Sequence, residues 1–177
     1  MSASTAEVVL NNPAYFLDLE ASSLMPGSWP IEIGVASVKD GVVVSDARLI
    51  QPHTSWSDDL WSAESEAVHG ITLEELEKTG SSIEEVLAWY DTVNIGVAVS
   101  DNPEFDARWL GCLARLTRTP PRVRLVDFDT YVMMTLKDTA AVNKVFRHLE
   151  QCAVPHRAGE DARRMAEAWL VGAASES

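Results

Sequence analysis

The sequence predicts an α/β fold in which a central five-stranded mixed sheet has helices on both faces. Three runs rich in β-branched residues come first, at residues 14–20, 31–38 and 42–50. Two further strand-like runs, 93–100 and 123–128, alternate with segments that have helical periodicity. The order of three strands, helices, strand, helix, strand and helices indicates a mixed sheet between helical layers.

The first three strands are expected to form an antiparallel meander. Residues 14–20 alternate apolar and polar side chains, which is the period of a strand. The runs 31–38 and 42–50 are separated by Lys39-Asp40-Gly41. Because Asp-Gly between two β-branched runs is a strong hairpin signal, we expect these two strands to pair through a tight turn.

Helix start and stop signals follow the meander. Residues 58–69 have a helical pattern that ends before Gly70, a residue type favoured just beyond a helix. Thr72 and Ser82 each precede a glutamate by three residues. This capping-box spacing predicts that a short helix begins at each of them.

Three longer helices are predicted in the second half of the chain. Asn102 followed by proline predicts a helix start, with the helix continuing to about residue 116. Two further helices are indicated by apolar side chains that share one helical face. These are Val142, Val145, Phe146 and Leu149 in one, and Ala162, Met165, Ala166, Trp169 and Leu170 in the other.

Length and composition predict one globular domain over residues 1–177, in the cytoplasm. The chain has 177 residues, 46% of them apolar and 23% charged, which excludes disorder, collagen and coiled coil. No apolar run approaches the roughly 20 residues that cross a bilayer, so we expect no membrane partner. The N-terminus lacks a secretory signal pattern, and Cys112 and Cys152 are too few for a disulfide framework.

The charge restricts the class of binding partner. The net charge is −13, from 14 basic and 27 acidic residues. Wrapping a duplex needs a broad basic face, so that role is excluded, whereas a small pocket for a strand end is not. Five arginines lie in an acid-free stretch, 107–126, and form either an electropositive patch or a solvated helix face and loop. They are Arg108, Arg115, Arg118, Arg122 and Arg124.

Two carboxylates lie two residues apart in the first predicted strand. Asp18 and Glu20 therefore point to one face of the strand, and Leu17 and Leu19 to the other. Neighbouring buried carboxylates repel each other and lose hydration, which is costly unless a cation compensates. The pair indicates either a divalent metal site or an edge strand with a wet polar face.

Asp106 lies in the first turn of the helix that begins after Asn102, near the end of a sheet strand. Ordinary stabilisation of a helix start is the alternative explanation for this acid. Asp101 competes for the same role, but we expect it to be solvated at the strand end.

His156 follows a proline and is expected on a loop, with Asp161 on the helix that comes next. An acid beside a surface histidine is the alternative explanation here. Taken together, four inward carboxylates and a loop histidine indicate a two-metal hydrolase. A set of oxygen ligands favours Mg²⁺ or Mn²⁺ over zinc.

Three spaced blocks resemble the exonuclease motifs of the DEDDh superfamily, which includes polymerase proofreading subunits, ribonuclease T and oligoribonuclease. The blocks are Asp18-Leu-Glu20, Asn102-Pro-Glu-Phe-Asp106 and His156-Arg-Ala-Gly-Glu-Asp161. Pro30-Ile-Glu-Ile-Gly34 and His69-Gly-Ile-Thr72 are further matches. The resemblance covers about residues 14–171, and the family fold is ribonuclease H-like.

The resemblance implies an activity and a set of roles. Asp18, Glu20, Asp106 and Asp161 would hold two ions, Mg²⁺ or Mn²⁺, and His156 would act as general base. The reaction would remove nucleotides from the 3′ end of single-stranded RNA or DNA, or of short oligonucleotides, and release 5′-monophosphates. Family analogy also implies a homodimer. Many members have threonines and a glycine after the first block, where this chain has Ala21-Ser22-Ser23-Leu24.

Substrate binding is expected beside the acid blocks. Leu24 and Phe105, together with Met25 and Trp29, are candidates for stacking on terminal bases, and ordinary packing is the alternative, favoured for Trp29. Arg157 is either a phosphate ligand or a solvated side chain. We expect RNA to be slightly favoured, since the stand-alone length resembles that of RNA-trimming members. The alternatives are a DNA repair or proofreading exonuclease and a non-catalytic nucleic-acid binding module.

Overall fold

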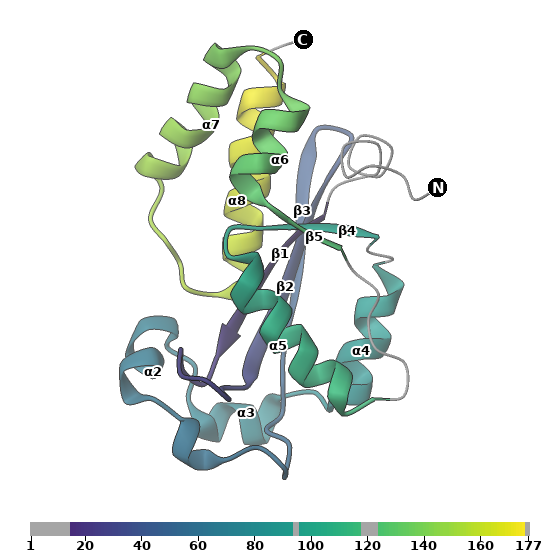
Figure 1. The fold of residues 1–177 in the computed structure, drawn as a ribbon, viewed down its shortest axis with the longest axis vertical. Helices are drawn as coiled ribbons and strands as arrows, with labels where there is room; N and C mark the ends of the chain where they lie inside the picture. Colours follow the sequence, from purple (N-terminus) through teal and green to yellow (C-terminus); the bar gives the residue numbers. More distant parts are fainter. Residues whose placement is uncertain (1–14, 94–95, 118–123, 176–177) are drawn as a thin grey trace.

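The computed structural model describes residues 15–93, 96–117 and 124–175. Five strands form one sheet in the order β3-β2-β1-β4-β5 (Figure 1). Strands β1 to β3 are antiparallel neighbours, whereas β4 pairs in parallel with both β1 and β5. The strands are β1 Tyr15–Ala21, β2 Pro30–Lys39, β3 Val42–Leu49, β4 Val97–Ser100 and β5 Arg124–Asp127. The predicted mixed five-stranded sheet is confirmed.

The meander and its hairpin are confirmed. Lys39 pairs with Val42 across the turn. Asp40 and Gly41 both have positive φ, 52° and 75°, which is the conformation that a two-residue type I′ turn requires. Glycine takes this conformation without a steric penalty, and aspartate is among the few other residues that tolerate it.

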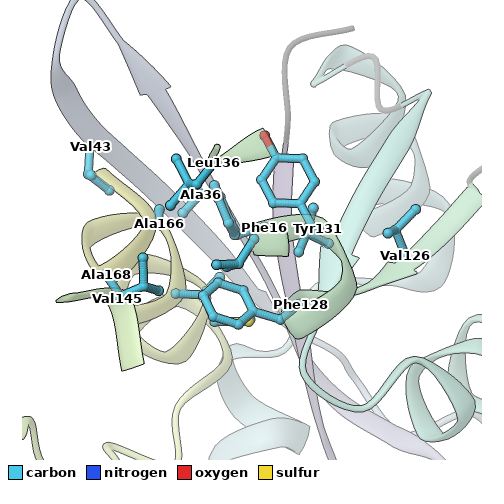
Figure 2. Packing of buried hydrophobic residues seen from close by; sticks show 14 of the residues in the cluster. Phe16, Ala36, Val43, Val126, Phe128, Tyr131, Leu136, Val145, Ala166 and Ala168 are labelled. Atoms are coloured by element: carbon cyan, nitrogen blue, oxygen red, sulfur yellow. The ribbon is translucent and has the colours of Figure 1, made fainter. Parts of the chain in front are cut away.

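Helices cover both faces of the sheet, as predicted. Phe16 and Ala36 pack with α6, α7 and α8 on one face (Figure 2). Leu17 and Ile33, from the same two strands, pack with α4 and α5 on the other. The helices are η1 Asp58–Leu60, α2 Ala63–His69, α3 Leu73–Thr79, α4 Ile83–Thr92, α5 Pro103–Arg115, α6 Phe128–Thr135, α7 Thr139–Gln151 and α8 Ala158–Ala173. Among the described residues, none of these helices is long and apolar enough to cross a bilayer.

The single helix predicted over 58–69 is wrong, because the segment forms two elements. A 3₁₀ turn, η1, ends at Leu60, and α2 begins only after Ser62. The Ser62 side chain accepts a hydrogen bond from the Ser65 amide at 3.2 Å and so caps α2. The predicted stop is confirmed, since Gly70 has a left-handed backbone.

Two strand boundaries also differ from the prediction. β4 begins at Val97 rather than at 93, because α4 continues to Thr92 and residue 93 ends that helix; residues 94 and 95 lie outside the described part. β5 ends at Asp127, whose side chain accepts a 2.8 Å hydrogen bond from the Thr130 amide. Phe128 therefore starts α6, a helix that the sequence pattern did not indicate.

Candidate active site

On the face of β1 that packs on α8, the side chains change from apolar to acidic along the strand. Phe16 is fully buried in the core beneath α6 and α8. Asp18 and Glu20 follow on the same face, because side chains two apart on a strand point the same way. The apolar layer thus ends in two carboxylates at the carboxyl end of β1. β1 lies inside the sheet, between β2 and β4, but β4 pairs with it only at Tyr15 and Phe16, so Asp18 and Glu20 lie just beyond the end of β4 and pair with β2 alone.

The parallel pairing of β4 with β1 brings Asp106 to the same end of the sheet. Phe16 pairs with Val99, so the chain leaves β4 beside the acidic part of β1 and turns into α5. Asp106, in the first turn of α5, is only 2% exposed and accepts a hydrogen bond from the Ser100 hydroxyl. Asn102 is the N-cap residue of α5 and Pro103 begins the helix, as predicted, although the Asn102 side chain makes no capping hydrogen bond.

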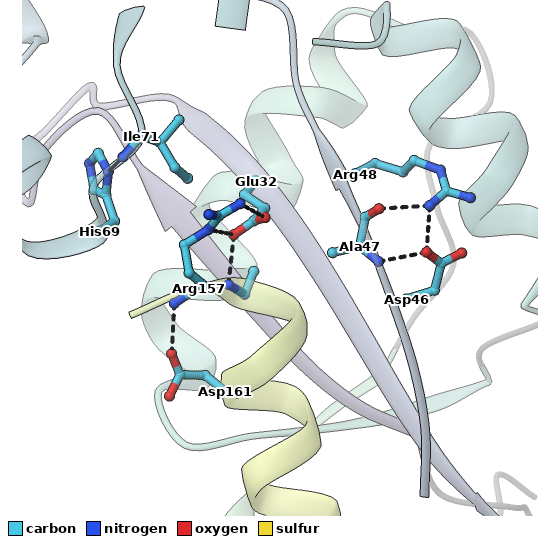
Figure 3. Close-up of polar contacts among 9 residues, drawn as sticks. Glu32, Asp46, Ala47, Arg48, His69, Ile71, Arg157 and Asp161 are labelled. Atoms are coloured by element: carbon cyan, nitrogen blue, oxygen red, sulfur yellow. Dashed lines mark hydrogen bonds and ion pairs between the residues drawn. The ribbon is translucent and has the colours of Figure 1, made fainter. Parts of the chain in front are cut away.

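The first turn of α8 contributes the fourth carboxylate. Asp161 is buried and accepts a 3.0 Å hydrogen bond from the Arg157 amide (Figure 3). Carboxylate oxygens of Asp18, Glu20 and Asp161 lie within 4.8 Å of one another. The structure therefore brings together acids that are more than 140 residues apart in the sequence.

Loss of hydration is the largest cause of the raised pKa of each of the four carboxyl groups, and repulsion between members of the set adds to it at Asp18 and Glu20. Burial first, and then the neighbouring charges of Asp106 and Glu20, raise the pKa of Asp18 well above its usual value. Burial, followed by Asp161 and Glu32, raises the pKa of Glu20 to about 8. Burial raises the pKa of Asp106 to about 7, although the Ser100 hydrogen bond opposes the shift.

This donor set fits divalent metal ions. Burial also raises the pKa of Asp161, so all four carboxyl groups are held in a state that disfavours their charge. A bound cation relieves such repulsion, and ligand sets made only of carboxylate oxygens suit Mg²⁺ and Mn²⁺. Asp18, Glu20 and Asp161 could hold an ion between them, with Asp106 close enough to Asp18 to raise its pKa.

His156 lies on the segment between α7 and α8, as predicted, and it is exposed. Its φ of 54° places it in the left-handed region, which a non-glycine residue adopts at a cost. Its charge lowers the pKa of Asp161, so the imidazole lies within electrostatic range of the carboxylate cluster. A histidine in this place can exchange protons with solvent and with a molecule bound at the acids.

A buried acid that the sequence analysis did not single out lies beside the cluster. Glu32 on β2 is the pairing partner of Glu20 and is 4% exposed. Its carboxylate accepts two hydrogen bonds from the Arg157 guanidinium, at 3.1 and 2.8 Å (Figure 3). The signal was present in the sequence, because Glu32 interrupts a run of β-branched residues much as Asp18 interrupts its strand.

The predicted substrate-binding residues have different surroundings. Leu24 is 69% exposed on the segment after β1. Phe105 packs on Trp109 with ring centroids 5.4 Å apart. Trp29 is fully buried, so the packing alternative holds for it. The Arg157 guanidinium is engaged by Glu32, and the roles of Leu24, Phe105 and Arg157 toward substrate stay predictions.

The arginine-rich stretch has packing partners where the structure describes it. The Arg108 guanidinium carbon lies 4.5 Å from the centre of the Phe105 ring. Arg115 donates a 3.0 Å hydrogen bond to the Cys112 sulfur. Arg118 and Arg122 lie outside the described residues. These contacts bind Arg108 and Arg115 to their own helix and favour packing over a free electropositive patch there.

Comparisons with known proteins agree with this geometry. Residues 15–169 match the RNase_T family, whose description is "Exonuclease". Exonuclease X bound to 5′-overhanging duplex DNA is 22% identical with a TM-score of 0.58, covering 93% of this chain and 92% of that one. The nuclease domain of 3′hExo, a DEDDh family member bound to rAMP, is 15% identical with a TM-score of 0.66 and 92% coverage of both chains.

Escherichia coli Exonuclease I bound to a dA16 oligonucleotide is 14% identical with a TM-score of 0.67, and the match covers 92% of this chain but 41% of that one. At these identities the three structures establish a shared fold, which confirms the ribonuclease H-like prediction. A comparison with curated protein sequences gives no match. With the family matched over nearly the whole described chain, the chain belongs to the RNase_T exonuclease family.

Proposed function

We propose that this chain hydrolyses the 3′-terminal phosphodiester bond of single-stranded nucleic acid with two divalent ions, Mg²⁺ or Mn²⁺, and releases nucleoside 5′-monophosphates. The observation that carries the proposal is the gathering of Asp18, Glu20 and Asp161 oxygens within 4.8 Å, beside the buried Asp106. Acids gathered in this way repel one another, which raises their pKa values and is costly to maintain unless a cation compensates the charge.

The residues of the site would have different roles in catalysis. Asp18, Glu20, Asp106 and Asp161 would hold the ions through carboxylate oxygens, and the Ser100 hydroxyl fixes the orientation of Asp106. When bound, such ions supply positive charge that stabilises the attacking and the leaving oxygen of an in-line displacement. His156 would take the proton from the attacking water at a ring nitrogen, and its exposed position gives it access to that proton.

The substrate we propose is a short single-stranded 3′ end, with RNA slightly preferred over DNA. Leu24, exposed on the segment after β1, and Phe105 would stack on terminal bases, and Arg157 would contact a phosphate. The net charge of −13 leaves few sites for phosphates far from the scissile one. Of the relatives, 3′hExo was solved with rAMP and Exonuclease I with a DNA oligonucleotide, so both sugars are compatible with the fold.

A labelled oligonucleotide tests the proposal. RNA and DNA of one sequence, labelled at the 5′ end, are incubated with Mg²⁺, with Mn²⁺ or with chelator. We expect a ladder that shortens from the 3′ end only when an ion is present, and 5′-monophosphates as product. The Asp106→Asn protein is the control for contaminating nucleases and should leave the substrate intact. Shortening in chelator, or none with either ion, contradicts the proposal.

The DNA-directed alternative has one specific observation in its favour. Exonuclease X, solved with a 5′-overhanging duplex DNA, matches this chain over 92% of its own length. A DNA duplex with a recessed 3′ end, compared with single strands of RNA and DNA, separates the two candidates. Faster trimming of the recessed duplex end would favour a DNA repair role.

Three further properties belong to the same proposal. We propose one domain over residues 1–177, a homodimer and a cytoplasmic location, as the sequence and the family resemblance imply. Light scattering coupled to size-exclusion chromatography measures the dimer directly. A monomeric mass across the micromolar range would contradict it. The non-catalytic alternative predicts oligonucleotide binding without shortening in the assay above.

A further inference from the structure

Glu32 makes three hydrogen bonds to the start of α8, from a strand that is distant in sequence. One oxygen accepts from the Arg157 Nε at 3.1 Å and from the Ala158 amide at 2.8 Å, and the other accepts from the Arg157 Nη2 at 2.8 Å. Because Glu32 is 4% exposed, its carboxylate is shielded from water, and the three hydrogen bonds join it to two adjacent residues.

The backbone of β2 approaches the same turn of α8 closely. A Cβ at Gly34 would lie 2.1 Å from the carbonyl carbon of Ala158, a distance that real structures do not allow. On β3, the Cβ of Ala47 lies 2.8 Å from where a Cβ on Gly159 would stand. The amino end of α8 therefore rests directly on the sheet, and Glu32 fixes it there (Figure 3).

Arg157 transmits this anchoring to two candidate active-site residues. Its amide donates to Asp161 at 3.0 Å, while its guanidinium is held by Glu32. His156 is its immediate neighbour and has a left-handed backbone with φ of 54°. Such a conformation persists only where the surroundings fix it, and Arg157 is fixed at both its main chain and its side chain.

We propose that Glu32 is a positioning residue that acts through Arg157 to hold His156 in its productive orientation. This inference rests on the proposed role of His156 as general base. Glu32 touches neither substrate nor ion in this scheme. A general base that is displaced contributes little to the rate, since a shift of about 1 Å costs roughly a hundredfold in rate.

The kinetic test uses Glu32→Gln, which keeps the shape but places an NH₂ group against the donors of Arg157 and Ala158. We expect kcat to fall roughly 10- to 100-fold, with KM and Mn²⁺ affinity within about twofold of the native values. In a His156→Ala background the same change should cost less than about twofold, because the group it positions is gone. An equal loss in both backgrounds would overturn the proposal.

A second variant covers the case in which Glu32→Gln fails to fold. Arg157→Lys keeps the charge but loses the two-pronged contact with the carboxylate. A fall in kcat that disappears in the His156→Ala background supports positioning. The proposed phosphate contact of Arg157 allows a rise in KM as well, but a kcat that is unchanged by Arg157→Lys would show that Arg157 does not position His156 and would overturn the proposal.

A measurement without substrate separates this inference from the proposed function. Amide hydrogen exchange over residues 153–158 should be at least about tenfold faster in Glu32→Gln than in the native protein. Glu167→Gln, which breaks an exposed ion pair with Arg163 on the same helix, is the matched control and should leave it unchanged. Unchanged exchange in Glu32→Gln overturns the anchoring. If exchange is faster in Glu32→Gln but the native protein shortens no oligonucleotide, the proposed function is contradicted while the anchoring of α8 by Glu32 is supported.

Discussion

Glu20 shows at the scale of one residue how burial and charge act together. Its carboxyl group is half-buried and close to that of Asp161, and Glu20 pairs across the sheet with Glu32; these surroundings raise its pKa from 4.5 to about 8. The nearby Arg157 opposes the shift, but the guanidinium is already engaged by Glu32. The folded protein therefore holds a proton on Glu20 at pH values where the unfolded chain has lost it.

This shift predicts a pH dependence of stability for the ion-free protein. Between pH 4.5 and about 8 the folded state binds more protons at Glu20 than the unfolded state does. The free energy of unfolding must then fall as pH rises through this window. Glu20→Gln stays neutral, so in chelator its melting temperature should exceed the native one increasingly toward pH 8.5, by about 2–4 °C for each kcal/mol.

The control for this prediction is the same pair of proteins with Mn²⁺ added. If Glu20 is a metal ligand, the ion should stabilise the native protein more than Glu20→Gln and reverse their order at pH 8.5. Two melting curves that run parallel from pH 5 to pH 8.5 in chelator would show that Glu20 ionises normally.

His156 allows a second prediction at the residue scale. Its imidazole lies outside the carboxylate cluster, so His156→Ala should leave Mn²⁺ affinity unchanged by calorimetry. The same change should lower kcat by roughly 10²–10⁴, the usual value of general base catalysis. His53→Ala, at a half-buried histidine that contacts Ser55, is the control and should retain native activity. Native kcat in His156→Ala would remove the histidine from the mechanism.

At the scale of elements, the first turn of α8 depends on a close contact with β2. A methyl group at Gly34 would overlap the Ala158 backbone at 2.1 Å, so Gly34→Ala forces the strand and the helix apart. We expect a loss of at least the 1–3 kcal/mol that is typical of overpacking, or roughly 2–12 °C in melting temperature. Gly111→Ala, inside α5 with its nearest neighbour 3.5 Å away, should be neutral or stabilising. Equal melting temperatures for the two variants would contradict this account of the α8 contact.

Local signals predicted the elements whose ends are set locally. The Asp40-Gly41 turn and the Ser82 capping box both occur as expected, because each depends only on a few adjacent residues. The break after η1 was missed because it depends on tertiary contacts of Trp61, which packs on Trp29 with ring centroids 5.6 Å apart. The end of α4 was likewise misjudged, since β-branched residues after it also suit a strand.

The sequence predicted which residues form the candidate site, but not the contacts between them. Asp18, Asp106 and Asp161 each had a local alternative explanation, and only their order along the chain joined them. The Glu32–Arg157 contact joins residues 125 positions apart, and no periodicity or capping rule reports on such a distance. The Glu32–Arg157 contact arises from the tertiary fold, which packs α8 on β2.

At the scale of the whole molecule, the negative charge of the site would be neutralised by bound cations, whereas that of the surface would remain. The chain carries 27 acidic and 14 basic residues, and three of the acids, Asp18, Glu20 and Asp161, are gathered where a cation would neutralise them. The remaining surface is still strongly negative and repels a phosphate backbone. Arg157 is paired with Glu32, whereas Arg108 and Arg115 keep their charge but contact the Phe105 ring and the Cys112 sulfur of their own helix.

The excess of acidic over basic residues predicts how the activity depends on salt concentration. If only two or three phosphates next to the scissile bond are contacted, log(kcat/KM) should fall against log[KCl] with a slope of about −2, from roughly 0.7 per contact for single strands. The measurement compares oligonucleotides of 6 and 30 nucleotides between 50 and 300 mM KCl at fixed Mn²⁺ concentration. Both lengths should give the same slope, because the added phosphates meet a negative surface. A slope that steepens with length, toward the value near −10 of a duplex-binding repressor, would mean that a basic track along the protein guides the strand.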